Sequence, residues 1–336
     1  MGRNFEHLQG NRELAARGAL VSDTRPMPSL RTLHSRRRTS PAIAAAIALA
    51  AIALLAARTR ADENLWVYTR GAETLPKGRG EIYFQNLFKI GKNTGHYLAW
   101  DIQPELEYGL TDRLTLQLET TTFYHNFGNV PFDPYTGIHR NKTTFGGFDV
   151  ALKYMILSPY KDAFGLAVGL DYEKRYAYRL DGSPTSQDTF EPIIYLQKNF
   201  LDDTLIVAAK GLLEFERRLF KDGSGTLEEE IAFDVAVGIS YRFAPNWYIG
   251  LEARAQADFL EASFNNPNSL NWGRNFQRGI YVGPSIHYGG KSFWATLGVL
   301  TQVYGGPDKG TPDSDSSKNW DEHERLHVGL TVGYNF

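Results

Sequence analysis

The amino-acid sequence predicts an all-β protein that folds as a closed antiparallel up-and-down transmembrane β-barrel of about 12 strands. From residue 81 onward, apolar and polar residues alternate with a period of two, and only a β-strand sorts such a pattern onto two faces. Short and long connections alternate between these segments, as in a membrane barrel with tight turns at one rim and larger loops at the other. A soluble β-sandwich has no reason to alternate its connections in this way.

The composition limits the chemistry that is open to the chain. Its 336 residues include no cysteine, 13% aromatic residues and a formal net charge of −2. The lack of cysteine excludes a disulfide framework, a thiolate nucleophile and a cysteine-based metal site. Apolar runs are too few for a bundle of transmembrane helices.

The one long apolar run is Ala-rich and covers residues 41–57. Three arginines at 36–38 precede it, and Thr59 and Ala61 place small residues at the two positions that a signal peptidase reads. This pattern predicts a secretory signal peptide that is cleaved near Ala61. The alternative is an uncleaved anchor helix, although the run is a little short for a full span.

Three regions follow from this interpretation: an N-terminal extension and secretory signal peptide at residues 1–61, a periplasmic lead-in at residues 62–80 and the barrel at residues 81–336. The start of translation is either Met1 or Met27. Without residues 1–61 the chain holds 26 basic and 35 acidic residues, a net charge of −9. A chain this acidic disfavours nucleic acid as a partner.

The clearest pair of strands is a hairpin at residues 98–124. In each half, apolar residues occupy one face and polar, often acidic, residues occupy the other. Between the halves, residues 109–113 have the turn-forming composition that joins antiparallel neighbours. A turn centred on Thr111 pairs Glu105 with Gln117 across the two strands.

The other strands follow in order from the same alternation. Long polar loops are expected at residues 125–146, 260–277 and 305–322, where Gly, Pro, Asn and Asp interrupt the pattern. With the hairpin, the predicted strands cover residues 81–90, 98–108, 114–124, 148–156, 164–172, 190–197, 205–216, 231–241, 247–257, 280–288, 293–303 and 326–336.

The last strand carries the most specific pattern in the chain. Apolar residues occupy every second position up to the C-terminus, namely Val328, Leu330, Val332, Tyr334 and Phe336. This pattern resembles the C-terminal signature of Gram-negative outer-membrane β-barrels, which implies recognition by the barrel assembly machinery. The resemblance also implies transfer by periplasmic chaperones, contact with outer-membrane lipid and location in the cell outer membrane.

Two further segments carry a narrower resemblance. The sequences LPKGRGE at residues 75–81 and ELEYGLTDRLTLQLE at residues 105–119 are similar to a set of poorly characterised, transporter-like outer-membrane barrels. That set implies an architecture and a location, and it offers no catalytic motif.

If the apolar face of each strand points toward lipid, the alternate residues line the lumen of the barrel. Acids outnumber bases on this face by about two to one, so the lumen is expected to concentrate cations and repel anions. The same charges can instead fill a narrow barrel with a hydrogen-bonded network that does not conduct. The expected lumen-lining residues are Asp101, Gln103, Glu105, Glu107, Gln117, Glu119, Asp149, Lys153, Asp171, Glu173, Arg175, Lys210, Arg242, Glu252, Arg254 and Asp258.

These patterns favour an outer-membrane channel for passive diffusion of small polar solutes, cationic or neutral, whose identity is unknown. The alternative is a non-conducting structural or surface-interaction barrel that acts through its extracellular loops. No enzymatic activity, cofactor or metal is expected. A hydrolase built on Ser285 and His287 is the third interpretation, and no oxyanion motif stands beside these residues. The acidic loop around Asp313 lacks the glycine and distal glutamate of an EF-hand calcium loop.

Overall fold

The computed structural model describes residues 64–130, 139–221, 223–264, 271–306, 317–320 and 323–336. The predicted signal peptide, its cleavage near Ala61 and the acidic loop around Asp313 lie outside the described residues. In the described part of the chain, no helix has the length and the apolar character needed to cross a membrane.

Twelve β-strands form within the described residues, and their ends at the short turns lie close to the predicted positions. The strands are β1 (Gly80–Ile90), β2 (His96–Thr111), β3 (Leu114–Gly128), β4 (His139–Leu157), β5 (Gly165–Ala177), β6 (Pro184–Phe200), β7 (Leu205–Phe220), β8 (Leu227–Ala244), β9 (Trp247–Leu260), β10 (Arg274–Gly289), β11 (Phe293–Gly306) and β12 (Leu326–Asn335).

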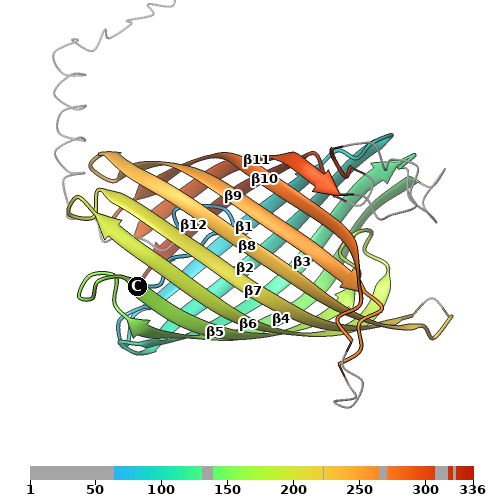
Figure 1. Cartoon of the computed structure of the whole chain (residues 1–336), viewed down its shortest axis with the longest axis horizontal. Coiled ribbons are helices and arrows are strands. Elements are labelled where there is room, and N and C mark those ends of the chain that lie inside the picture. Colours follow the sequence, from blue (N-terminus) through green and yellow to red (C-terminus); the bar gives the residue numbers. More distant parts are fainter. Residues whose placement is uncertain (1–63, 131–138, 222, 265–270, 307–316, 321–322) are drawn as a thin grey trace, which may run out of the picture. The chain divides into compact units, whose positions relative to one another are not determined.

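Each strand pairs antiparallel with its sequence neighbours, and β1 also pairs with β12, so the sheet closes into a barrel (Figure 1). At the closing seam, the backbones of Gly80 and Phe336 exchange two hydrogen bonds, at 3.0 and 2.9 Å. Closure pairs every strand edge, which is the condition for a sheet that spans lipid. The structure therefore confirms the predicted closed, twelve-stranded, up-and-down barrel.

The two faces of the strands differ as the period of two predicts. Outward apolar side chains are exposed, for example Leu106, Leu118 and Val237 at 39%, 42% and 45%. Inward side chains are buried in the lumen, for example Tyr83 and Glu107, each 2% exposed. The outer face is thus apolar, as contact with lipid requires.

The opening hairpin has the predicted faces but a different register. Glu105 pairs with Glu119 and not with Gln117. The predicted pairing is wrong by two residues, because the turn is centred on residues 112–113 and a bulge interrupts the ladder beside it. A shift by an even number keeps every side chain on its face. The true register brings two acids directly opposite each other.

Several strands continue past their predicted ends on the side of the long loops. β3 ends at Gly128 and β4 begins at His139, so the loop predicted at residues 125–146 is shorter than expected. The inward residues Phe127 and Tyr97 pack together in this region. Strand ends that project beyond the hydrocarbon need no apolar outer face, and the apolar alternation therefore stops before the strands do.

Deletion of Phe336 is expected to impair closure of the barrel. The change removes both backbone hydrogen bonds with Gly80 and the exposed aromatic ring at the end of the predicted assembly signal. Phe336→Tyr keeps both features and is the matched control. The fraction of protein with heat-modifiable migration on a gel should fall several-fold for the deletion. Full assembly of the shortened chain would contradict this role.

Candidate functional site

Residues 64–77, here called the inner segment, run through the lumen and reach the short-turn rim, where Lys77 is exposed and its N–H group donates to Asp112. Leu65, Trp66 and Val67 are at most 3% exposed and pack with buried residues of the wall. These residues belong to the predicted periplasmic lead-in at 62–80, and no local pattern in the sequence indicates that they enter the lumen. They occupy the half of the lumen nearer the short turns, which form the periplasmic rim in barrels of this kind.

One carboxylate binds three consecutive residues of the inner segment. Glu252 on β9 is 1% exposed. It accepts hydrogen bonds from the backbone N–H groups of Val67, Tyr68 and Thr69 at 3.0, 2.9 and 2.6 Å, and from the Thr69 hydroxyl at 2.8 Å. Hydrogen bonds to an ionised acceptor are about twice as strong as neutral ones. Glu252 therefore anchors the inner segment.

Glycines on the inner face of the wall leave room for the inner segment. A Cβ atom at Gly238 on β8 would overlap the indole ring of Trp66. A Cβ atom at Gly298 on β11 or at Gly329 on β12 would overlap Val67. Glycine within a strand permits such a close approach of another chain segment. The wall is thus shaped for these two side chains.

The middle of the inner segment is attached to the opposite side of the barrel. Lys153 on β4 donates a hydrogen bond to the carbonyl oxygen of Gly71 at 2.9 Å. The side-chain oxygen of Gln197 on β6 accepts a hydrogen bond from the N–H group of Ala72 at 2.7 Å. The inner segment therefore crosses the lumen from β9 to the wall formed by β4 and β6.

The two residues considered for catalysis hold the beginning of the inner segment instead. The Ser285 hydroxyl donates to the carbonyl oxygen of Leu65 at 3.1 Å. His287 Nδ1 lies 2.7 Å from the Thr296 hydroxyl, which donates to the carbonyl oxygen of Asn64 at 2.5 Å. These contacts give both residues an anchoring role.

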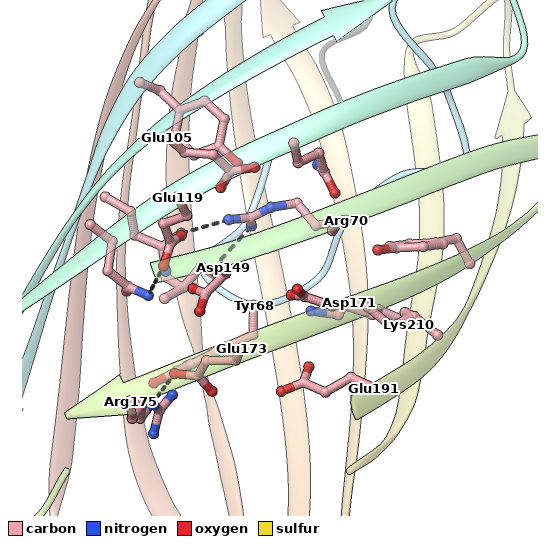
Figure 2. Close-up of a pocket in the computed structure, with 18 residues that line it drawn as sticks. Tyr68, Arg70, Glu105, Glu119, Asp149, Asp171, Glu173, Arg175, Glu191 and Lys210 are labelled. Atoms are coloured by element: carbon pink, nitrogen blue, oxygen red, sulfur yellow. Dashed lines mark hydrogen bonds and ion pairs between the residues drawn. The ribbon is translucent and has the colours of Figure 1, made fainter. Parts of the chain in front are cut away.

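A cavity of about 210 Å³ lies between the inner segment and the wall formed by β1 to β7 (Figure 2). Tyr68 and Arg70 of the inner segment form part of its lining. Acids outnumber bases around it by six to three. The acids are Glu105, Glu119, Asp149, Asp171, Glu173 and Glu191, and the bases are Arg70, Arg175 and Lys210.

Four of these acids form a row across adjacent strands, here called the carboxylate ladder. Glu105 on β2 lies opposite Glu119 on β3. Asp149 on β4 lies opposite Glu119, and Glu173 on β5 lies opposite Asp149. Side chains at directly opposite positions have Cβ atoms about 5 Å apart, and like charges there destabilise a sheet. Arg175 pairs with Glu173 at one end of the ladder, and Gln103 donates a hydrogen bond to Glu119 within it.

A second group of acids approaches the geometry of a metal site. One carboxylate oxygen each of Glu173, Glu191 and Glu214 lies within 4.8 Å of the others. Oxygen ligands suit hard cations, and Ca²⁺ takes about six to eight of them. The three carboxylates supply only part of such a set, and Arg175 already pairs with Glu173. The three carboxylates therefore do not form a complete metal site.

The predicted lumen-lining residues fall into several settings. Those at the cavity are Gln103, Glu105, Gln117, Glu119, Asp149, Asp171, Glu173, Arg175 and Lys210. Those that bond to the inner segment are Lys153 and Glu252. Four others form a hydrogen bond with a neighbouring side chain: Asp101 with Lys89, Glu107 with Tyr83, Arg254 with Asp234, and Asp258 with Gln277. Arg242 lies at the short-turn rim and donates to the Asp202 carbonyl oxygen and the Thr204 hydroxyl.

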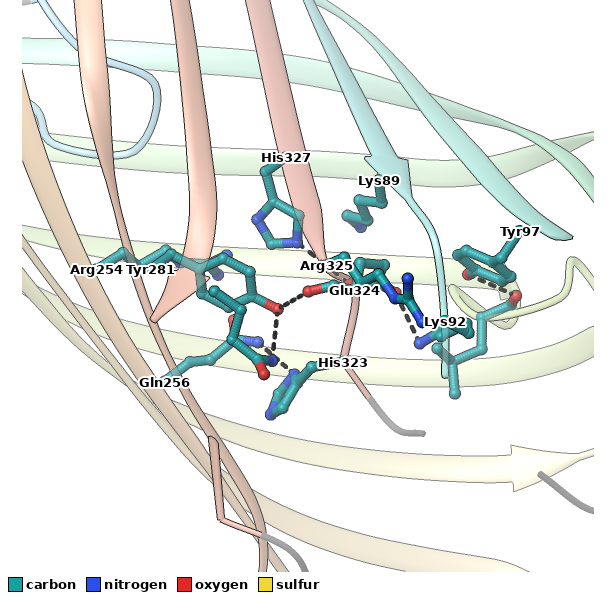
Figure 3. Close-up of polar contacts among 12 residues, drawn as sticks. Lys89, Lys92, Tyr97, Arg254, Gln256, Tyr281, His323, Glu324, Arg325 and His327 are labelled. Atoms are coloured by element: carbon teal, nitrogen blue, oxygen red, sulfur yellow. Dashed lines mark hydrogen bonds and ion pairs between the residues drawn. The ribbon is translucent and has the colours of Figure 1, made fainter. Parts of the chain in front are cut away.

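Buried polar residues connect the inner segment with the long-loop end of the barrel, where Figure 3 shows Lys92, Glu324 and His327. The Tyr68 hydroxyl lies 2.7 Å from His327 Nδ1 on β12. His327 Nε2 lies 3.2 Å from Glu324, and Glu324 pairs with Lys92 at 3.0 Å. Lys92, Glu324 and His327 are here called the latch. Lys92 follows β1 and Glu324 precedes β12, so the latch joins two outer connections to the inner segment.

The latch keeps Glu324 in its charged form. Burial alone raises the pKa of a carboxyl group. The ammonium group of Lys92 and the hydrogen bond with His327 outweigh burial and hold the pKa of Glu324 well below its usual range. Burial lowers the pKa of the adjacent His323 to about 3, so His323 is neutral at physiological pH.

The closed barrel, its apolar outer face and its charged lumen define the protein as a β-barrel of the Gram-negative outer-membrane class. The chain belongs to a family of unknown function (DUF6662), which matches residues 58–336. The match includes the inner segment as well as the strands. No curated protein matches the sequence.

Comparison with solved structures finds outer-membrane barrels of low sequence identity. The COG4313 outer membrane channel from Pseudomonas putida F1 is 12% identical, with a TM-score of 0.51 over 79% of this chain and 98% of that chain. The NanC porin is 9% identical, with a TM-score of 0.44 over 75% and 98% of the two chains. The KdgM porin is 12% identical, with a TM-score of 0.41 over 76% and 99%. The likeness to the COG4313 channel shows a shared barrel fold.

Replacement of Gly238 by alanine is expected to expel Trp66 from its place on the wall. The added methyl group overlaps the indole ring, and overpacking of this kind costs about 1–3 kcal/mol. Gly211→Ala on β7 is the matched control, because a Cβ atom there meets only Ile194, at 3.4 Å. Trypsin digestion with mass mapping should show cleavage after Arg70 in Gly238→Ala and protection in the control. Equal protection of the bond after Arg70 in Gly238→Ala and Gly211→Ala would show that Gly238 is not needed to hold Trp66 on the wall.

The depressed pKa of Glu324 predicts how the free energy of unfolding depends on pH. A carboxyl group with a depressed folded-state pKa contributes stability above its unfolded pKa, and the contribution is lost as the pH falls through the folded-state value. Glu324 should therefore keep its contribution at pH 5. Lys92→Met removes the compensating charge, so burial dominates and the pKa of Glu324 rises.

We expect Lys92→Met to lower the free energy of unfolding by on the order of 3 kcal/mol, as for a broken buried ion pair. The urea midpoint in detergent at pH 7 and at pH 5 measures the effect. Lys161→Met, in an exposed turn, is the control, and its urea midpoints at pH 7 and pH 5 should equal those of the native protein. Equal urea midpoints for Lys92→Met and Lys161→Met would show that the latch contributes nothing to the stability of the protein.

Proposed function

We propose that the protein is an outer-membrane channel whose acidic lumen admits small polar solutes, cationic or neutral, by passive diffusion. The carboxylate ladder is the observation that carries the proposal. Like charges at directly opposite positions cost stability, and a wall that needed only stiffness would be served by neutral or fully paired side chains. A row of acids in a narrow lumen focuses a negative field, which concentrates cations.

The pairing of charges supports the same sign of selectivity. Three bases in the lumen pair with acids, Arg175 with Glu173, Lys89 with Asp101 and Arg254 with Asp234. In contrast, the Oδ1 atoms of Asp149 and Asp171 are buried and have no hydrogen-bond partner within the described parts of the chain. Such oxygens are available to a cation that enters the cavity.

The inner segment favours a second candidate, a non-conducting barrel that acts through its loops. This segment places the buried side chains of Leu65, Trp66 and Val67 inside the lumen, as a structural filler would. The COG4313 protein is described as an outer membrane channel, which accords with the first candidate. The two candidates differ in conductance, and shortening an outer loop would abolish partner binding only in the second.

The proposal includes the export route that sequence analysis predicts. Residues 1–61 direct secretion and are removed near Ala61, and periplasmic chaperones carry the remaining chain. The barrel assembly machinery then recognises the pattern that ends at Phe336. Leu330 and Tyr334 of this pattern are 38% and 53% exposed on the outer face, where outer-membrane lipid would contact them.

The ladder is expected to set the selectivity for cations. In planar bilayers under a salt gradient, the reversal potential of the native protein should indicate preference for the cation. Glu105→Gln combined with Glu119→Gln keeps the size of both side chains, removes two charges and should weaken the preference several-fold. Asp188→Asn is the matched control, because this acid lies on the outer face beside Lys174. A preference for the anion in the native protein would overturn the proposed sign.

A further inference from the structure

The inner segment is attached to the barrel, but it is not part of the sheet. The strand pairings that close the barrel are complete without it. The wall holds it through side chains such as Glu252, Lys153 and Gln197. In the described chain, the first backbone-to-backbone hydrogen bond between this region and a strand of the wall is that of Gly78 with Gly109 on β2, after the segment ends, and the Pro76 carbonyl oxygen accepts one only from the nearby Arg79. The segment can therefore leave its place without the loss of any strand pairing.

The segment also stands across the path through the lumen. Val67 packs at Gly329 on β12, whereas Ala72 packs with Ala167 on β5 and Ile193 on β6. In a closed barrel of this strand order, β6 and β12 lie on opposite sides. A solute that enters the cavity from the long-loop end thus meets the segment before it reaches the periplasmic rim.

Among the side chains that hold the segment, which include Ser285, Lys153 and Gln197, Glu252 makes the largest number of hydrogen bonds to it. Glu252 accepts hydrogen bonds from three consecutive backbone N–H groups and one hydroxyl. Loss of this carboxylate would leave three buried donors without an acceptor, a condition that proteins avoid because of its high free-energy cost. Without Glu252, these donors are satisfied better by water outside the lumen.

Both the cavity and the latch touch the segment. Arg70 lines the cavity, so a cation drawn to the ladder meets its positive charge there, and like charges repel. Tyr68 lies between the guanidinium of Arg254, 3.9 Å from the ring centroid, and His327 of the latch. A cation in the cavity therefore acts on Arg70 of the segment, and a movement of the outer connections acts on Tyr68 through His327.

We propose that the inner segment is a gate. In this structure it closes the periplasmic half of the lumen, Glu252 holds it closed, and the latch couples it to the outer connections that carry Lys92 and Glu324. Opening consists of release of residues 64–77 from the wall, with the barrel unchanged. The proposal rests on the proposed channel function and adds its regulation.

The first test weakens the hold on the gate. Glu252→Ala in the full-length protein should raise the conductance in planar bilayers several-fold over the native protein. It should also make the bond after Arg70 sensitive to trypsin, because the released segment reaches solvent. Asp188→Ala, which removes an acid from the outer face, is the control and should match the native protein in both measurements.

The second test locks the gate. The chain contains no cysteine, and a Cβ atom at Gly329 would lie 3.2 Å from the Cβ atom of Val67, near the roughly 3.8 Å of a disulfide. Val67→Cys and Gly329→Cys are added to Glu252→Ala. Oxidation should restore the native conductance and protect Arg70, and reduction should reverse both effects. Each single cysteine in the same background is a matched control that should not respond to oxidation.

The two readouts separate failure of the gate from failure of the channel. Equal conductance before and after oxidation, with the disulfide verified by mass, would overturn the gate and leave the channel in place. Protection of Arg70 in Glu252→Ala with native conductance would also overturn the gate. Cleavage that the lock controls, without conductance in any variant, would overturn the channel and show a movable segment in a barrel that does not conduct.

Discussion

No backbone N–H or C=O group that faces lipid can remain without a hydrogen-bond partner, and the rest of this structure depends on that constraint. Closure of β1 onto β12 satisfies it. The same ladder fixes the direction of every side chain, because neighbours along a strand point to opposite faces. Apolar residues then face lipid, and the polar residues between them share one narrow lumen. The charged cavity and the inner segment are both consequences of this sorting.

The sequence could predict the strands and the inward direction of acids such as Glu105 and Glu119, because a period of two is a local signal. It could not predict which acids meet. The prediction paired Glu105 with Gln117, whereas the structure pairs it with Glu119. An even shift in register leaves the pattern of faces unchanged, so alternation alone does not distinguish the two pairings. The carboxylate ladder became visible only in the structure.

The inner segment was beyond the reach of local patterns. Residues 64–77 have no periodicity, and the anchor of Val67 lies 185 positions away at Glu252. One signal was present: Gly238, Gly298 and Gly329 occupy inward positions at which other strands carry polar side chains. Glycine at such a position marks the close approach of another part of the chain. Together with the apolar residues around Trp66, these glycines would have indicated an occupant of the lumen.

The position of those glycines also bears on how the protein is assembled. Val67 needs Gly298 on β11 and Gly329 on β12, and it needs Glu252 on β9. Contacts between such distant parts of a chain form only after the intervening chain is in place. The part of the wall that contacts Val67 therefore forms only after the C-terminal strands have joined the sheet. The first described residues of the chain are the last to become fixed, and a newly completed barrel is open before its own N-terminal segment closes it.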